Sequence, residues 1–276
     1  MERNRTQNYP ELKAVLENSN LPEVIRDNLK LVLEEKLRVI SRDYNFSMLD
    51  VGTSDGEMSL PLAQWLKGNF DNFIYTALEP EGPAFEKLNA RIKTQGIDYA
   101  KSSNLTIEKY LEAKKGEEDL FDFILFSHVF YHIPREKWAD VIAGSQRLLR
   151  PNGFILVVLD SSEGKAYELA DLITENKTRA DTLEFGNLYY AEDMEDFLTK
   201  NGVKHVVKSF ATNIFIQEDG RELHNFARVL AFLYRTFPER ILANHKGDLE
   251  KSLEKTKRGN RYVLEDIAKV ITFGKD

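Results

Sequence analysis

The most informative segment of this chain reads Met48-Leu49-Asp50-Val51-Gly52-Thr53-Ser54-Asp55-Gly56-Glu57. The apolar run over 46–51 is typical of a β-strand and stops at Gly52, and a helix-like pattern follows over 57–67. A strand that enters a helix through a glycine turn lets a ligand lie against bare backbone, because glycine has no Cβ. The segment therefore predicts a ligand-binding turn between a strand and a helix.

An acidic residue follows the next predicted strand, over 73–78. Glu79 comes directly after this apolar run, and a carboxylate at such a position commonly accepts hydrogen bonds from ribose hydroxyls. A carboxylate behind a buried strand is costly unless it is hydrogen-bonded, and two ribose hydroxyls would satisfy it. The turn and Glu79 together predict an adenosine-type cofactor site.

The turn also distinguishes between two classes of adenosine cofactor. A dinucleotide fingerprint reads G-x-G-x-x-G and rests a pyrophosphate on the helix N-terminus. Here the small residues are Gly52, Ser54 and Gly56, at a different spacing. The segment also carries three acidic side chains, which are Asp50, Asp55 and Glu57. Their charge would repel a pyrophosphate and suits a cationic cofactor. An ordinary glycine-containing turn is the structural alternative.

The composition narrows the possible functions. With 276 residues, of which 42% are hydrophobic, the chain can bury a full core. A net charge of −7 and a pI near 5.5 argue against a nucleic-acid partner. The absence of cysteine excludes disulfides, thiolate metal sites and a cysteine nucleophile, and we expect no metal centre. No apolar run is long enough to span a bilayer, and the N-terminus does not look like a signal peptide. We therefore expect no membrane partner and a cytoplasmic location.

The hydrophobic pattern alternates between strand and helix periods, which predicts a doubly wound, mostly parallel α/β sheet. The predicted strands are 46–51, 73–78, 97–100, 121–127, 153–160, 204–217 and 269–273. The predicted helices are 57–67, 82–94, 105–114, 135–149, 164–176, 191–201, 221–237 and 247–257. We expect one domain over 1–276. Its expected parts are an N-terminal helical lead (1–44), a cofactor-binding core (45–217), a helical cap inserted before the last strand (218–262), and that strand (263–276).

The order of these segments resembles that of class I S-adenosylmethionine-dependent methyltransferases. Residues 50–56 resemble their motif I, and 121–128 resemble the fourth-strand motif that borders the methyl-transfer site. Residues 129–134 resemble the loop after that strand, and 148–153 resemble the L-(K/R)-P-G-G turn. The resemblance covers roughly residues 45–217. It implies a Rossmann-like methyltransferase fold with a seven-stranded sheet, S-adenosylmethionine as cofactor and S-adenosylhomocysteine as product.

A narrower resemblance is to the histamine N-methyltransferase-like group. Gly56-Glu57 and Glu79-Pro80 resemble that group's GE and EP pairs, and Ser102-Ser103 resembles its serine pair beside the adenine. The chain differs from the group at Ser54 in the turn, and at His128, where the group has a glutamine that contacts the imidazole. The resemblance implies a methyl acceptor of the amine or imidazole type, without implying histamine itself.

The resemblance also implies a set of cofactor-binding residues. They are Asp50, Gly52, Ser54, Gly56, Glu57, Glu79, Pro80, Ser102, Ser103 and Ser127. Some of them have structural alternatives. Asp50 could instead be an acid that favours the helix N-terminus, and the two serines could cap the helix that follows them.

Candidates for catalysis and substrate binding lie elsewhere in the chain. His128 ends the fourth strand, at the edge where open α/β sheets bind ligands, so it could accept a proton or orient a substrate. Tyr131 lies in the loop after it, and both residues could equally be satisfied by the loop itself. Tyr189, Tyr190 and Phe226 are candidates for the walls of a substrate pocket with cation–π contacts, and core packing is the alternative.

These interpretations lead to one expected function and two alternatives. We expect an S-adenosylmethionine-dependent methyltransferase that acts on a small molecule, at an amine or imidazole nitrogen. The alternatives are a methyltransferase that modifies protein or RNA, and a cofactor-binding module without catalysis. A small-molecule methyl acceptor is the expected partner, and a monomer is favoured.

Overall fold

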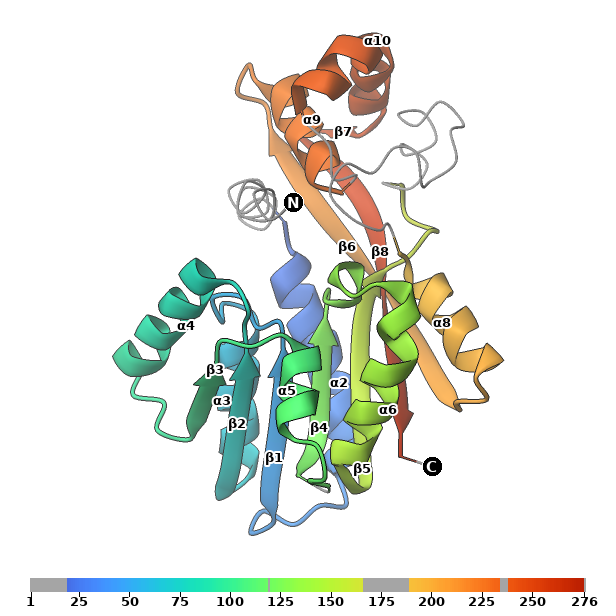
Figure 1. Cartoon of the computed structure of the whole chain (residues 1–276). Helices are drawn as coiled ribbons and strands as arrows, with labels where there is room; N and C mark the ends of the chain where they lie inside the picture. The colour runs from blue at the N-terminus through green and yellow to red at the C-terminus, as the bar shows by residue number, and fades with distance from the viewer. Residues whose placement is uncertain (1–18, 119, 166–188, 234–237, 276) are drawn as a thin grey trace. The chain divides into compact units, whose positions relative to one another are not determined.

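The computed structural model describes residues 19–118, 120–165, 189–233 and 238–275 (Figure 1). The strands are β1 (Asn45–Val51), β2 (Asn72–Leu78), β3 (Ala100–Ser103), β4 (Phe121–Ser127), β5 (Leu149–Asp160), β6 (His205–Gln217), β7 (Lys257–Arg258) and β8 (Arg261–Gly274). Among the described residues they form one sheet in the order β3-β2-β1-β4-β5-β8-β6, and β7 pairs with β8. The pairs β1–β2, β1–β4, β2–β3 and β4–β5 are parallel. The predicted α/β sheet is confirmed, with seven strands in its main order and β7 as a short addition.

Helices separate most of the strands. They are α2 (Leu21–Leu37), α3 (Ser59–Asn69), α4 (Gly82–Thr94), α5 (Ile107–Ala113), α6 (Trp138–Leu148), α8 (Ala191–Lys200), α9 (Glu222–Leu233) and α10 (Pro238–Lys255), with 3-10 turns η1 (Phe130–His132) and η2 (Arg135–Lys137). The predicted helix at 164–176 lies almost wholly outside the described residues, as does the 234–237 end of the predicted helix 221–237. Across the described helices, none is long and apolar enough to cross a membrane.

The central strands are buried along almost their whole length. β1 is buried from Phe46 to Val51 and β4 from Phe121 to Phe126. Continuous burial of this kind is typical of parallel strands that are covered on both faces. Because these strands are parallel, their carboxyl ends meet at one edge of the sheet (Figure 1). That edge receives the turn after β1, Glu79 after β2, and His128 after β4.

The third strand lies three residues later than the sequence predicted. The apolar Ile97 was expected to start the strand 97–100, but it closes α4 instead. Its amide donates to the carbonyl of Ile92, and the amide of Gly96, at φ +62°, donates to the carbonyl of Lys93. These two hydrogen bonds form the Schellman ending of a helix, in which an apolar residue follows the glycine. The prediction was wrong here because a helix-closing apolar residue and a strand-opening one look alike in sequence.

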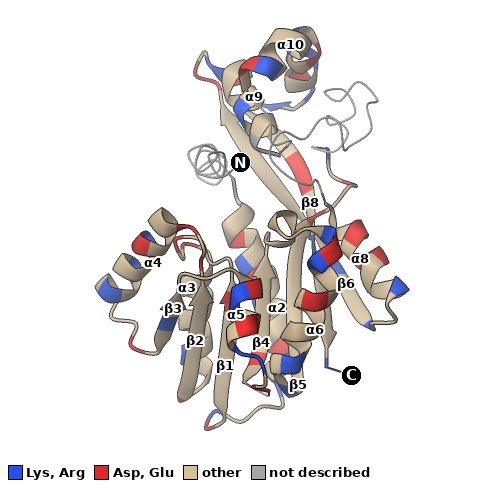
Figure 2. Ribbon diagram, viewed as in Figure 1, with Lys and Arg blue, Asp and Glu red and all other residues tan. Residues whose placement is uncertain are grey.

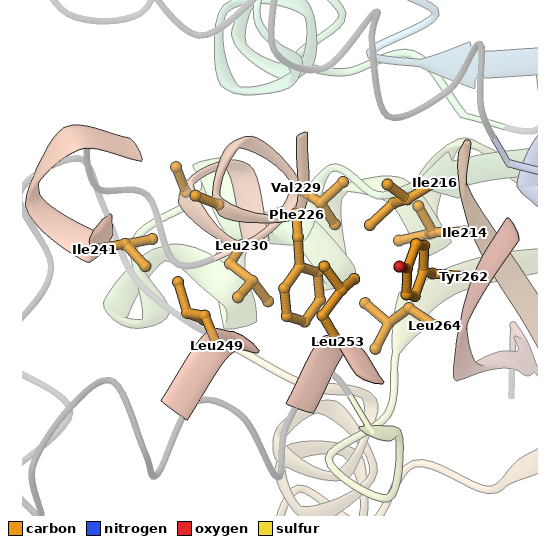
Figure 3. Packing of buried hydrophobic residues seen from close by; sticks show 12 residues of the cluster. Ile214, Ile216, Phe226, Val229, Leu230, Ile241, Leu249, Leu253, Tyr262 and Leu264 are labelled. Carbon is orange, nitrogen blue, oxygen red and sulfur yellow. The ribbon is translucent and has the colours of Figure 1, made fainter. Parts of the chain in front are cut away.

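The chain divides into two compact units. The sheet unit comprises Ile25–Leu159, Asp193–Lys208 and Lys269–Asp276, and the α9–α10 unit comprises Met1–Val24, Asp160–Glu192 and Ser209–Ala268. The α9–α10 unit has its own hydrophobic core, shown in Figure 3, where side chains of β6, α9, α10 and β8 point toward one another. The predicted insertion 218–262 falls within this unit. The division into a lead, core, cap and last strand stays a prediction.

Candidate functional site

The turn after β1 lies against the end of β2. The amides of Gly52 and Thr53 donate to the carbonyl oxygen of Leu78 at 2.8 and 3.0 Å. Gly52 has φ +69°, and a Cβ added to it would lie 2.7 Å from Cγ2 of Val129. Glycine is therefore required here both by the left-handed backbone and by the close approach of the loop after β4.

Ser54 and Gly56 complete the turn in the same left-handed conformation. Their φ angles are +55° and +80°. A Cβ on Gly56 would lie 2.8 Å from Cδ1 of Leu60 in α3 and 2.8 Å from Cδ1 of Leu88 in α4. Ser54 adopts the backbone shape that a glycine would take more easily. The departure from the glycine-rich pattern therefore leaves the shape of the turn intact.

Glu79 closes the other side of the turn. Its side chain is buried, Oε2 accepts from the amide of Ser54 at 2.7 Å, and Oε1 accepts from the amide of Glu81 at 2.8 Å. Burial raises the pKa of Glu79, and these two backbone hydrogen bonds oppose the rise. A carboxylate offers about four lone-pair sites. Each oxygen can therefore accept from a further donor, as two hydroxyls of a ribose would require.

Residues at the end of β3 hydrogen-bond the main chain of Glu79. The Glu79 amide donates to the carbonyl of Ser103 at 3.1 Å, and Nδ2 of Asn104 donates to the Glu79 carbonyl at 2.8 Å. Ser102 Oγ donates to Oδ1 of Asn89 in α4 at 2.6 Å. The predicted pair Ser102 and Ser103 thus lies beside Glu79. Pro80 follows Glu79 at the surface.

Arg91 of α4 balances the acidic side chains of the turn. Its Nη2 lies 3.0 Å from Oδ2 of Asp55 and 3.7 Å from Oε2 of Glu57. Oδ1 of Asp55 also accepts from the amide of Glu57 at 3.2 Å. Arg91 therefore neutralises most of the charge of Asp55. Asp55 attracts a cationic cofactor less strongly than the sequence suggested. Sequence reasoning missed Arg91, because it is 36 residues from Asp55 and belongs to no motif.

Asp50 lies on the buried side of the turn. Its side chain is 1% exposed, and Oδ2 accepts from the hydroxyl of Tyr75 at 2.8 Å. That hydroxyl also lies 3.1 Å from Oγ of Ser59, the first residue of α3. Burial raises the pKa of Asp50, and hydrogen bonds from Tyr75, Ser59 and Thr53 oppose the rise. The carboxylate thus faces protein groups instead of an open surface.

The two predicted catalytic residues form a pair after β4. His128 follows Ser127, the last residue of that strand, and its amide donates to the carbonyl of Val158 in β5 at 2.9 Å. The Tyr131 hydroxyl lies 3.4 Å from Nδ1 of His128. His128 has φ +56°, a conformation that costs a non-glycine residue energy and is often found at functional sites. The structure brings an imidazole and a phenol together at the ligand edge of the sheet.

The predicted substrate-pocket residues belong to the α9–α10 unit. Phe226 is fully buried in the core of that unit, Tyr190 is buried, and Tyr189 is half-buried. Phe226 packs with the aliphatic side chains labelled in Figure 3. Phe226 is therefore packed in a hydrophobic core, as the alternative interpretation expected. A substrate pocket lined by these three residues stays a prediction.

Comparison with known proteins identifies a family. Residues 18–208 match the family model described as a methyltransferase domain. No curated protein matches the chain. Neither the family model nor the solved structures described next single out a histamine N-methyltransferase-like group.

Several solved structures have a similar fold. A protein of Bacillus halodurans C-125, provisionally described as a methyltransferase, is 14% identical, with a TM-score of 0.54 over 87% of this chain and 97% of that one. The YcgJ protein of Bacillus subtilis is 12% identical, with a TM-score of 0.52 over 88% and 99%. A Galdieria sulphuraria protein, provisionally described as a sarcosine dimethylglycine methyltransferase, is 16% identical, with a TM-score of 0.52 over 91% and 86%. At these identities the likeness concerns the fold alone.

Proposed function

Since this chain belongs to the methyltransferase domain family, we propose that it transfers a methyl group to a nitrogen of a small molecule, either an amine or an imidazole. The cofactor of the family is S-adenosylmethionine, and it is the methyl donor of this chain. When bound, this cofactor supplies a methyl group on a positively charged sulfur that leaves as a neutral thioether.

The turn and Glu79 fit an adenosyl group. Gly52, Ser54 and Gly56 all have positive φ angles, which give the turn its tight path beside Glu79. The observation that carries the proposal is Glu79, a buried carboxylate at the carboxyl end of β2 whose oxygens can each accept one more donor. We assign the ribose to Glu79 and the adenine side to Ser102 and Ser103, with Pro80 closing the turn after Glu79.

His128 and Tyr131 are proposed to act on the methyl acceptor. Methyl transfer from a sulfonium is an in-line displacement, which needs a neutral nitrogen with a free lone pair and accurate alignment. An imidazole ring nitrogen can accept a proton, so His128 can take the proton that the acceptor nitrogen loses after transfer. The Tyr131 hydroxyl beside Nδ1 can hold the ring in place or pass that proton onward.

The charge of the chain supports a small acceptor over a nucleic acid. The net charge is −7. Figure 2 shows basic and acidic residues interspersed along helices such as α5 and α10, so neither helix presents a basic stripe. Nucleic-acid binding relies on clustered Lys and Arg residues. The nitrogen acceptor itself rests on the sequence resemblance of Gly56-Glu57, Glu79-Pro80 and Ser102-Ser103.

The proposal is tested by measuring S-adenosylhomocysteine release from the purified protein. Small amines and imidazoles, a mixed RNA and a peptide library are supplied in parallel as acceptors. We expect release with one or more of the small nitrogen compounds. Release only with RNA or peptides would refute the acceptor class. A cell extract is supplied as a further source of acceptors. Tight binding of S-adenosylmethionine with no release of S-adenosylhomocysteine in any of these mixtures would identify a binding module without catalysis.

A further inference from the structure

A buried polar network lies beneath the cofactor turn and has no part in the ligand contacts described above. It joins Asp50 of β1, Tyr75 of β2 and Ser59 of α3, whose side chains are at most 1% exposed. The Tyr75 hydroxyl is central, because it lies 2.8 Å from Oδ2 of Asp50 and 3.1 Å from Oγ of Ser59. The turn begins two residues after Asp50 and ends just before Ser59. The network thus connects the two ends of the turn.

The Asp50 carboxylate has an unusual set of partners. In the described part of the chain, the Tyr75 hydroxyl hydrogen-bonds Oδ2 of Asp50, the Ser59 hydroxyl contacts that of Tyr75, and no cation pairs with the carboxylate. The Thr53 hydroxyl donates to the main-chain carbonyl of Asp50. Burying a carboxylate without a counter-charge is costly, and hydroxyl donors offset only part of the cost. The charge of such a group is weakly screened by solvent, so it acts over a longer distance than a surface charge.

We propose that Tyr75, together with Ser59, is a positioning residue that keeps Asp50 ionised beneath the turn, so that its charge favours the sulfonium cofactor over the neutral thioether product. This inference rests on the proposed cofactor site. Tyr75 and Ser59 touch neither ligand and act through Asp50. The expected benefit is selective: S-adenosylmethionine carries the positive sulfur that the buried charge attracts, and S-adenosylhomocysteine does not.

The titration behaviour of the network supports this assignment. Burial raises the pKa of Asp50, and the hydrogen bond from Tyr75 opposes the rise, so loss of this donor should raise the pKa further. Burial and the nearby Asp50 charge raise the pKa of Tyr75 well above 10, so its hydroxyl stays neutral and donates. Glu79 is also titratable, and the Asp50 charge raises its pKa. Glu79 is assigned to the ribose, which both ligands share, so its titration cancels in the ratio of the two affinities.

The test is the ratio of the dissociation constants of the two ligands, measured by calorimetry from pH 5.5 to 8. Asp50→Asn keeps the volume and removes the charge, so it should weaken S-adenosylmethionine about tenfold more than S-adenosylhomocysteine at pH 7.5. As the pH falls and Asp50 becomes protonated, the preference for S-adenosylmethionine should be lost. Tyr75→Phe removes a hydrogen-bond donor to Asp50, so this loss should occur about one pH unit higher than in the wild type. Ser59→Ala removes the hydroxyl that contacts Tyr75 from α3. It should also raise the pH at which the preference for S-adenosylmethionine is lost.

Tyr44→Phe is the control, because it also removes a tyrosine hydroxyl that donates to an aspartate, Oδ1 of Asp122, at 2.8 Å. Tyr44 precedes the first residue of β1, whereas the cofactor turn follows the last residue of that strand. It should leave the selectivity unchanged. Equal weakening of both ligands in Asp50→Asn and Tyr75→Phe would show a bracing role and overturn the inference. A change in Tyr44→Phe as large as that in Tyr75→Phe would also overturn it. A folded wild-type protein that binds neither ligand would instead refute the cofactor site itself.

Discussion

Replacing Gly52 with alanine should distort the cofactor turn through two separable costs. The first is the left-handed backbone at φ +69°, which disfavours any residue with a Cβ. The second is the contact of the new Cβ with Cγ2 of Val129, which would be only 2.7 Å away. Gly96→Ala is the matched control. Gly96 has φ +62° but no heavy atom within 4 Å of an added Cβ, so it carries only the first cost.

The two costs can be given magnitudes. A left-handed conformation costs an L-residue about 1–2 kcal/mol. Overpacking in a tight site adds about 1–3 kcal/mol, and Val129 is β-branched and stiff, so it cannot easily move aside. Gly52→Ala should therefore lower the free energy of unfolding by about 2–5 kcal/mol, against about 1–2 kcal/mol for Gly96→Ala. Shortening the neighbour with Val129→Ala should remove most of the difference.

Urea unfolding followed by tryptophan fluorescence measures these values. Trp65 and Trp138 are the two tryptophans of the chain, and both lie in the sheet unit. The double-mutant cycle of Gly52→Ala with Val129→Ala isolates the contact. Equal losses in Gly52→Ala and Gly96→Ala, or no change in the cost of Gly52→Ala in the Val129→Ala background, would refute the steric argument.

Two further predictions concern catalysis and pH. His128→Asn keeps a side chain that tolerates a left-handed backbone but removes the base. Single-turnover rates should therefore fall more than cofactor affinity, and a normal rate with the true substrate would remove His128 from the site. Burial and the charge of Asp160 raise the pKa of Asp266 to about 8, so the fold favours the protonated acid. This stabilising effect is complete below the unfolded pKa of about 3.9 and is lost as pH rises through about 8. The melting temperature of the wild type should therefore fall from pH 5 to 9 relative to Asp266→Asn, and parallel curves would contradict this assignment.

The sequence was most informative where one residue type has one physical use. Glycines at 52 and 56 predicted a tight turn, and the structure gives both residues positive φ. Glu79 after an apolar strand predicted a carboxylate at the sheet edge, and it lies there next to the turn. His128 and Tyr131 are three residues apart in one loop, so their proximity also followed from local order.

The sequence was least informative where the meaning of a residue depends on a distant partner. In the sequence, Asp55 and Glu57 are negative charges without an evident partner, and in the structure Arg91 of α4 lies beside both. The hydrogen bond between Tyr75 and Asp50 could not be predicted either, because it depends on how β1 packs against β2. Such pairings arise from tertiary packing and have no signature in local spacing or periodicity.

The central claim is that the turn after β1 and Glu79 hold S-adenosylmethionine. Calorimetric titration of this cofactor into the wild type, Glu79→Ala and Glu86→Ala tests it most directly. Glu86 is an exposed carboxylate on α4, so its removal controls for a general change in charge. We expect one binding site in the wild type, unchanged affinity in Glu86→Ala, and at least tenfold weaker binding in Glu79→Ala, about 1.4 kcal/mol. Equal affinity in all three proteins, or no binding to the folded wild type, would contradict the account.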